Sequence, residues 1–198
     1  MHVILLCGFK RCGKDTFANY ISQTYNYTHL KISQKLKDSL QTLFDFDKEQ
    51  IEGDKKDLLD TQWNITPRQA MQFVGTEIFQ HEIQKLIPNI KRDFWIKQIS
   101  NEIENIYKRS STENVVISDL RFIHEINYLS NMSLKYNNDI HLTIVKILRP
   151  EFVLRHDSRF HESESQHLQF NFDKIIQNTT EKEYRNEIDK LMKSFERE

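Results

Sequence analysis

The chain of 198 residues contains only two cysteines, three prolines and four glycines. Cys7 and Cys12 do not make a disulfide framework, which favours a reducing compartment. Lysine and arginine number 28 against 29 acidic residues, so overall charge does not indicate nucleic-acid or membrane binding. No apolar run is long enough to cross a bilayer, and the first residues lack a signal-peptide pattern. We therefore expect a cytoplasmic protein without nucleic-acid or membrane partners.

Five short apolar segments alternate with helical patterns along the chain. The predicted strands cover residues 3–7, 27–32, 115–118, 141–148 and 172–177. Such alternation is typical of βαβ units, so we predict an α/β fold with a five-stranded parallel sheet between two layers of helices. The length fits a single domain over residues 1–198.

Several helix starts are marked by capping residues. Thr66 and Pro67 predict one start, and Gln69 suits a capping box there. Thr180 predicts the start of the last helix, and Ser33 and Asp93 predict helices that run to about Leu43 and Arg109. The apolar stripe of the last helix comprises Tyr184, Ile188, Leu191, Met192 and Phe195.

Two segments, 45–64 and 150–167, fit neither a strand nor a long helix. We interpret the first as a loop or short helix. Both segments are expected at the carboxyl ends of the strands, where parallel sheets bind ligands.

A glycine-containing loop joins the first predicted strand to a helix. Gly8 and Gly13 permit backbone angles at which successive N–H groups point at one anion, and Lys14 adds a full positive charge. A strand, such a loop and a helix in this order predict a nucleoside-triphosphate site. Its residues are Gly8, Lys10, Arg11, Cys12, Gly13, Lys14, Asp15 and Thr16.

Asp15 stands where such loops normally carry the serine or threonine that holds Mg²⁺, and the hydroxyl follows at Thr16. An aspartate there is suited to bind Mg²⁺ directly or through water, which we favour. The alternative is that Asp15 only stabilises the first turn of the helix. At Cys12, a lowered thiol pKa is the alternative to a small loop residue, and we favour the latter.

Asp119 follows a predicted buried strand, where a carboxylate orients Mg²⁺-bound water or holds a substrate group. The alternative for Asp119 is that it caps the next helix. Arg121 follows two residues later, and the alternative to a functional role for it is a structural ion pair. Arg68, Gln72 and Thr76 recur every four residues and so share a helix face, which either binds a phosphate and a base or is simply solvated.

Arginines bracket the polar segment 150–167. Arg149, Arg155 and Arg159 suit a mobile lid over a phosphoryl group, and a solvated charged loop is the alternative. Histidines in the same segment do not match a standard zinc site, so we do not expect a structural metal there.

Taken together, these motifs resemble the P-loop deoxynucleoside monophosphate kinases of bacteriophages and large DNA viruses over nearly the whole chain. The motifs are Gly8-x-Lys10-Arg11-x-Gly13-Lys14-Asp15-Thr16, Leu36-Lys37-Asp38, Gly53-Asp54, Arg68-x-x-Met71-Gln72-x-x-Gly75-Thr76-Glu77, Asp93-x-Trp95, Asp119-x-Arg121-Phe122-x-x-Glu125, Arg149-Pro150 and His161-x-Ser163-Glu164. Departures are Ile123 and His124, where proline and asparagine are common, and a short 53–66 segment.

The resemblance implies a kinase that transfers the γ-phosphoryl group of ATP, with Mg²⁺, to a nucleoside monophosphate for dNTP supply. A viral protein of this kind would act in the host cytoplasm. Lys14, Arg121, Arg155 and Arg159 would be catalytic, Arg149 would help to bind ATP, and Asp15, Thr16 and Asp119 would hold the metal. The monophosphate site, within an acceptor segment of about 33–95 and its surroundings, would comprise Lys37, Arg68, Gln72, Gly75, Thr76, Trp95, Asp119, Arg121, Glu125, Ser163 and Glu164.

Two alternatives stay open at this stage. The same loop variant occurs in phosphomevalonate kinases of the animal type, whose acceptor is not a nucleotide. A nucleotide-binding module without catalytic activity is the other. The preferred base and the oligomeric state, a homodimer included, do not follow from the sequence.

Overall fold

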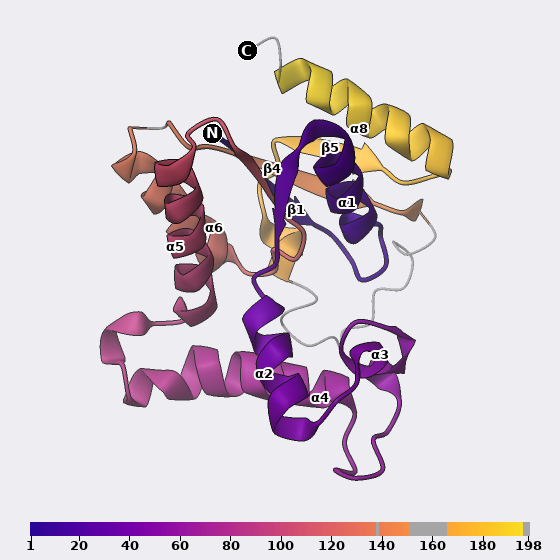
Figure 1. Cartoon of the computed structure of the whole chain (residues 1–198), viewed down its shortest axis with the longest axis vertical. Coiled ribbons are helices and arrows are strands. Elements are labelled where there is room, and N and C mark those ends of the chain that lie inside the picture. Colours follow the sequence, from indigo (N-terminus) through magenta and orange to yellow (C-terminus); the bar gives the residue numbers. More distant parts are fainter. Residues whose placement is uncertain (138, 151–165, 196–198) are drawn as a thin grey trace. The chain divides into compact units, whose positions relative to one another are not determined.

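The computed structural model describes residues 1–137, 139–150 and 166–195 (Figure 1). Its five parallel strands form one sheet in the order β2-β3-β1-β4-β5. The strands are β1 (His2–Cys7), β2 (Tyr27–Leu30), β3 (Asn114–Ile117), β4 (His141–Leu148) and β5 (Lys174–Gln177). The five predicted strands and their parallel pairing are confirmed.

The burial of β1 fits its position at the centre of the sheet. Its residues 3–7 are fully buried, as expected for a strand with neighbours on both sides and helices on both faces. Val3 pairs with Val115 of β3 on one side and with Leu142 of β4 on the other. The carboxyl ends of β1, β3 and β4 therefore lie side by side.

Helices cover both faces of this sheet (Figure 1). On one face, α1 (Lys14–Tyr25) and α8 (Glu181–Phe195) share a core with the even-numbered residues of β1. The predicted stripe of α8 enters that core. On the other side lie α5 (Phe94–Arg109) and α6 (Ile123–Lys135), so the predicted three-layer α/β/α fold is confirmed.

The chain divides into two compact units, one of Met1–Lys31 with Ile99–Glu198 and one of Ile32–Gln98. The second unit contains α2 (Gln34–Phe44), α3 (Lys48–Ile51) and α4 (Pro67–Gln72). A π-helix (Phe73–His81) and short 3₁₀ turns at Asp54–Asp57, Glu82–Lys85 and Pro88–Ile90 complete it. A further 3₁₀ turn, Gln166–Gln169, belongs to the first unit.

The predicted helix starts hold, with one difference in detail. Thr66 and Gln69 form the expected capping box of α4, and α5 begins directly after Asp93. α2 begins after Ser33, but the Ser33 backbone is already helical and its side chain makes no capping hydrogen bond. The segment 45–64 contains α3 and a 3₁₀ turn, in line with the predicted short helix.

The predicted helix that carries Arg68, Gln72 and Thr76 changes type along its length, because the α-helix ends at Gln72 and continues as a π-helix. The indole of Trp95 donates to the Gly75 carbonyl (2.9 Å), an acceptor that a regular helix would use internally. Gly75 also packs against Leu36, where a Cβ would approach the side chain to 2.6 Å.

Within residues 1–137, 139–150 and 166–195, every helix is too short or too polar to span a lipid bilayer.

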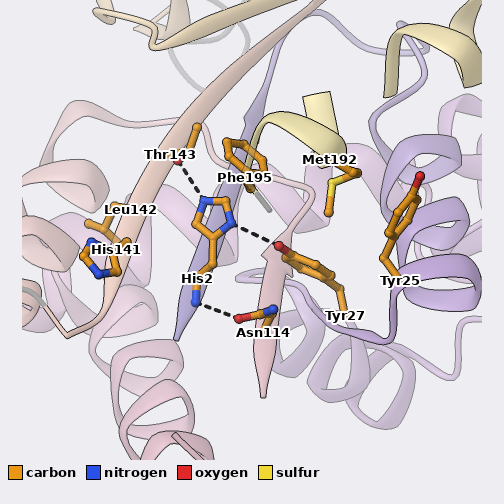
Figure 2. A pocket seen from close by; sticks show the side chains of 9 residues that line it. All are labelled: His2, Tyr25, Tyr27, Asn114, His141, Leu142, Thr143, Met192 and Phe195. Carbon is orange, nitrogen blue, oxygen red and sulfur yellow. Dashed lines mark hydrogen bonds between the residues drawn. The ribbon is translucent and has the colours of Figure 1, made fainter. Parts of the chain in front are cut away.

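A cavity of about 510 Å³ lies at the amino end of the sheet, where β1 to β4 begin (Figure 2). His2 stands in its wall and uses both ring nitrogens, Nδ1 with the Tyr27 hydroxyl (3.0 Å) and Nε2 with Thr143 Oγ1 (2.8 Å). Phe195 covers the same ring edge-on. Burial, followed by the nearby His141 and N-terminal ammonium, lowers the pKa of His2 to about 4.

We expect this histidine to make the protein less stable as pH falls. In the unfolded chain His2 takes up a proton near pH 6.5, whereas in the fold it resists protonation until about pH 4. Its contribution is thus complete above pH 6.5 and is lost between pH 6.5 and 4, in total about 3 kcal/mol. Urea unfolding of wild type and His2→Gln at several pH values measures the difference.

The comparison of variants isolates His2 from other titrating groups. Burial raises the pKa of Glu125 to about 7, so this carboxyl changes stability in the opposite direction over part of the same range. His81→Gln, at an exposed histidine of the π-helix, should keep the wild-type slope. Equal slopes for wild type and His2→Gln would contradict the prediction.

Candidate active site

The phosphate loop connects β1 to α1 in the backbone conformation that the glycines predict. Gly8 and Gly13 have φ angles of 139° and 107°, which side chains rarely adopt. A Cβ at Gly8 would lie 2.5 Å from the Ile147 carbonyl oxygen, and one at Gly13 would lie 2.3 Å from Asn178 Nδ2. Both positions thus need glycine for conformation and for space.

Side chains from the far end of the chain hold this loop in place. Asn178, which follows β5, donates through Nδ2 to the Cys12 carbonyl (2.9 Å). Tyr184 of α8 donates through its hydroxyl to the Gly13 carbonyl (3.0 Å). Because these carbonyl groups point toward Asn178 and Tyr184, the backbone N–H groups of the loop are left to bind an anion.

Lys14 folds back into the loop that it terminates. Its Nζ donates to the carbonyl oxygens of Gly8 (2.9 Å) and Phe9 (2.8 Å). The Cys12 N–H donates to the same Phe9 carbonyl (3.2 Å). The ammonium group therefore lies within the loop, beside the backbone amides that open α1.

Cys12 is a buried structural residue of the loop. It is 1% exposed, and burial raises the pKa of its thiol, so the favoured interpretation as a small loop residue is confirmed. Cys7, in β1, is also buried and free, with a thiol pKa raised to about 12. Neither cysteine forms a disulfide.

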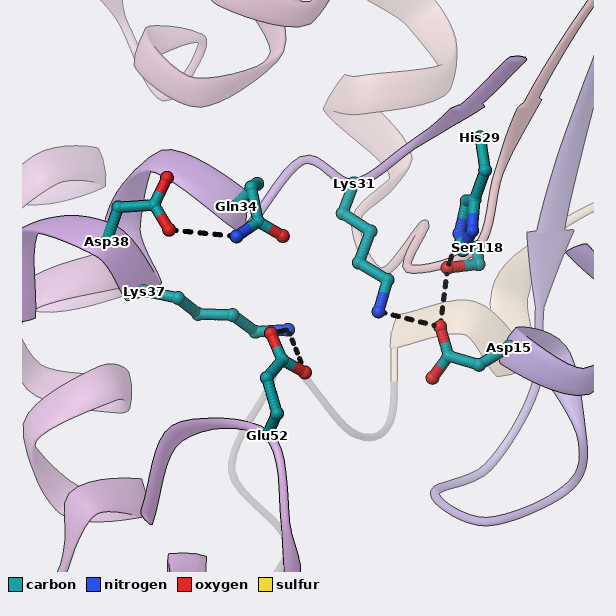
Figure 3. Close-up of polar contacts among 8 residues, drawn as sticks. All are labelled: Asp15, His29, Lys31, Gln34, Lys37, Asp38, Glu52 and Ser118. Atoms are coloured by element: carbon teal, nitrogen blue, oxygen red, sulfur yellow. Dashed lines mark hydrogen bonds and ion pairs between the residues drawn. The ribbon is translucent and has the colours of Figure 1, made fainter. Parts of the chain in front are cut away.

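Asp15 takes part in a network that joins the phosphate loop to the ends of two strands (Figure 3). Its Oδ1 accepts a hydrogen bond from Ser118 Oγ (2.9 Å) and forms an ion pair with Lys31 Nζ (3.1 Å). His29 Nε2 lies 2.8 Å from the same Ser118 hydroxyl. Since this hydroxyl donates to Asp15, it accepts from His29, which places the imidazole proton on Nε2.

The segment after β3 lies beside the phosphate loop, because β3 and β1 are neighbours. Ser118, which contacts Asp15, directly precedes Asp119, and Arg121 follows at the start of the turn into α6. Glu125 is 3% exposed, and its Oε2 accepts from the N–H groups of Arg121 (2.8 Å) and Phe122 (3.0 Å). Its carboxylate therefore orders the Asp119–Phe122 turn, whatever contact it makes with a substrate.

Arg149 follows β4, the neighbour of β1 on its other side. The carboxyl ends of three adjacent strands of one unit thus carry the phosphate loop after β1, Asp119 and Arg121 after β3, and Arg149 after β4. At the same end, the His167 ring packs edge-on against Phe9 of the loop, with 4.7 Å between ring centroids. The predicted residues Arg155, Arg159, Ser163 and Glu164 lie outside the described residues.

The remaining predicted acceptor residues belong to the unit Ile32–Gln98. There, two cations pair with acidic side chains. Lys37 is nearly buried and lies 2.9 Å from Glu52 Oε1, and Arg68 forms an ion pair with Asp57. Gln72 ends α4, and Gly75 and Thr76 are buried in the π-helix.

Trp95 is 8% exposed and packs against Phe79 and Phe94. Because its indole N–H donates to the Gly75 carbonyl, Trp95 holds the π-helix that carries Thr76 in place. Near the end of the same π-helix, the Gln80 side chain accepts two hydrogen bonds from Arg92 (2.7 and 3.1 Å).

Oxygen ligands are available for a divalent cation. Asp15, Thr16 and Asp119 supply carboxylate and hydroxyl oxygens, the donors that Mg²⁺ prefers. In the described ranges, three or more His, Cys, Asp or Glu side chains nowhere gather in a way that would hold a metal by themselves. This donor set suits a cation that keeps water and substrate oxygens among its ligands.

A phosphate loop after the central strand of a parallel sheet defines the class of P-loop proteins. A family model described as deoxynucleotide monophosphate kinase matches residues 2–64 and 45–183. The chain therefore belongs to the deoxynucleotide monophosphate kinase family, and it is a P-loop kinase.

One curated protein and two solved structures are similar to this chain. A mimivirus protein (Acanthamoeba polyphaga mimivirus), named "Putative deoxynucleotide monophosphate kinase", is 27% identical over 135 residues, which is 67% of this chain and 70% of the relative. Dephospho-CoA kinase from Campylobacter jejuni is a distant structural relative (TM-score 0.49, 15% identity, 98% and 96% of the two chains). Shikimate kinase from Aquifex aeolicus is similar at a TM-score of 0.46 and 15% identity, over 99% and 96% of the chains.

Sequence reasoning missed the residues that hold the loop. Lys31, Ser118 and His29 around Asp15 were not among the predicted site residues, nor was Asn178. Lys31, Ser118 and Asn178 carried a signal in their positions, because each lies near, at or just after the carboxyl end of a predicted strand. Tyr184 was predicted only as a core residue, although its hydroxyl reaches Gly13.

Proposed function

We propose that this kinase transfers the γ-phosphoryl group of ATP to a deoxynucleoside monophosphate. The observation that carries the proposal is the phosphate loop of a chain in this family, with glycines at positive φ and Lys14 turned into the loop. The acceptor is itself an anionic phosphate, so the transfer needs no side-chain base. Catalysis then consists of alignment and stabilisation of charge.

On the donor side, the loop amides and Lys14 would bind the phosphates of ATP. Asp15, Thr16 and Asp119 would hold Mg²⁺, which neutralises phosphate charge when bound. Lys10, Arg11 and Arg149 would add positive charge at the same end of the sheet. The structure supports this assignment by the position of Ser118 against Asp15, which brings the loop and the Asp119 turn together.

On the acceptor side, Arg68 is the residue most suited to the phosphate of the monophosphate. Its guanidinium is about one fifth exposed and already binds the Asp57 carboxylate, so it is held in place for an oxyanion. Arg121 stays a proposed ligand of this phosphate on the family resemblance. Lys37, Gln72, Thr76 and Trp95 stay proposed members of the pocket on the family resemblance.

A coupled assay that measures ADP formation tests the function. Purified protein is supplied with Mg·ATP and, one at a time, dAMP, dGMP, dCMP, dTMP and their ribonucleotide counterparts. Turnover with at least one deoxynucleotide is expected. Turnover only with phosphomevalonate would assign the chain to the other kinase type, and ATP binding without any transfer would indicate an inactive nucleotide-binding module.

Arg68→Ala is expected to raise KM for the monophosphate by about tenfold or more, with a smaller effect on kcat. The expectation follows from the loss of charge-assisted hydrogen bonds, each worth roughly 1.5–3 kcal/mol. Initial rates at varied monophosphate and saturating ATP measure both constants. Arg109→Ala at the end of α5 is the matched control, since it removes an exposed arginine that pairs with Glu113. An unchanged KM would remove Arg68 from the acceptor site.

A further inference from the structure

Asp15 places a negative charge in a loop that binds anions. Its side chain is 65% exposed and belongs to the first turn of α1, next to Lys14. A carboxylate there repels a polyphosphate whenever a metal ion does not lie between them. When no metal ion is bound, a positive charge close to Asp15 would offset this repulsion.

Lys31 supplies such a charge. Its Nζ lies 3.1 Å from Asp15 Oδ1, and its side chain is 22% exposed. Lys31 follows the last residue of β2 and belongs to the same compact unit as the loop. It reaches Asp15 from β2, while Ser118 reaches the same oxygen from the end of β3 (Figure 3).

The two contacts have different consequences. Ser118, itself bound by His29, donates a directed hydrogen bond and fixes the orientation of the carboxylate. Lys31 contributes the charge that offsets it. Because both act on Oδ1, Asp15 is held toward the strand ends before any ligand arrives.

We propose that Lys31 is the counter-charge that allows Asp15 to stand in the phosphate loop, and that it strengthens polyphosphate binding through Asp15 rather than by contacting phosphate. The inference rests on the proposed function, since it assumes that the loop binds the phosphates of ATP. It predicts that Lys31 contributes to polyphosphate affinity only while residue 15 carries a negative charge.

A double-mutant cycle tests this dependence. Binding of ATP and of inorganic tripolyphosphate is measured by calorimetry in EDTA and low salt, for wild type, Lys31→Met, Asp15→Asn and the double variant. Lys31→Met should weaken both ligands by about tenfold in the wild-type background, which corresponds to about 1.4 kcal/mol. In the Asp15→Asn background the same substitution should change affinity less than about twofold.

The matched control is Lys190→Met on α8, which removes one positive charge from a helix pair with Glu187 and should bind like wild type. Thermal unfolding of each variant shows that it is folded. Equal losses from Lys31→Met in both backgrounds would make Lys31 a direct phosphate ligand and overturn the inference, as would no loss in either. Wild-type protein that binds neither ligand, even with Mg²⁺, would overturn the proposed function as well.

Discussion

Lys14→Met is expected to lose about 10²-fold or more in turnover with ATP and its best monophosphate, while the protein stays folded. The Lys14 ammonium lies inside the loop, 2.9 Å and 2.8 Å from the carbonyls of Gly8 and Phe9. In the proposed function it would face the charge that builds on the phosphates during transfer, and a preorganised charge of this kind contributes about 10²–10³-fold in rate. Methionine keeps the length and the apolar part of the side chain but removes the charge.

Steady-state kinetics measures the expected loss of turnover, and circular dichroism tests whether the variant stays folded. The fold should survive because Lys14 is only partly buried, and water can reach the two carbonyls that it leaves. Lys174→Met, at an exposed lysine of β5, removes the same charge away from the loop and should be as active as wild type. A folded Lys14→Met enzyme with wild-type kcat would exclude this residue from catalysis.

The sheet was predictable because its signals are local. β1 and β4 are apolar runs, and the helices between strands carry their own caps, such as the Thr66–Gln69 capping box of α4. Alternation of strands and helices then leaves a parallel sheet as the simplest arrangement. The predicted strand ends shifted by one or two residues, as at β5, where Asp173 already binds the Ile144 N–H before the strand begins.

The support of the phosphate loop was not predictable, because it depends on residues distant in sequence. Asn178 and Cys12 are 166 positions apart, and Ser118 and Asp15 are 103 apart. These contacts follow from the strand order, which puts β1 between β3 and β4 and brings their carboxyl ends together. Neither hydrophobic period nor local propensity contains that order.

The π-helix was missed for a related reason. The pattern of Arg68, Gln72 and Thr76 has the period of an α-helix, and nothing local marks the change of turn after Gln72 except Gly75. The cause lies in Trp95, twenty positions away, whose indole takes the Gly75 carbonyl. The change of helix type after Gln72 thus depends on a tertiary contact and not on the local sequence pattern.

The second large effect is expected for Gly13→Ala, which should weaken binding of Mg·ATP by about 10²-fold or more. Gly13 has a φ of 107°, and an L-residue at positive φ pays roughly 1–2 kcal/mol in backbone strain alone. The added Cβ would also lie 2.3 Å from Asn178 Nδ2, so the hydrogen bond from Asn178 to the Cys12 carbonyl would break. The substitution therefore strains the backbone, clashes with Asn178 and removes a hydrogen bond that supports the loop.

Two further variants separate these causes by calorimetric titration of Mg·ATP. Asn178→Ala removes the support but leaves the glycine, and we expect it to weaken binding by only about tenfold, the scale of one lost hydrogen bond. Gly13→Ala/Asn178→Ala relieves the clash but keeps the strained φ, so it should bind no better than Gly13→Ala. Recovery of wild-type affinity in the double variant would show that Asn178, and not the backbone angle, makes glycine necessary at this position. Wild-type affinity in Gly13→Ala itself would mean that the loop does not bind phosphate through the conformation seen here.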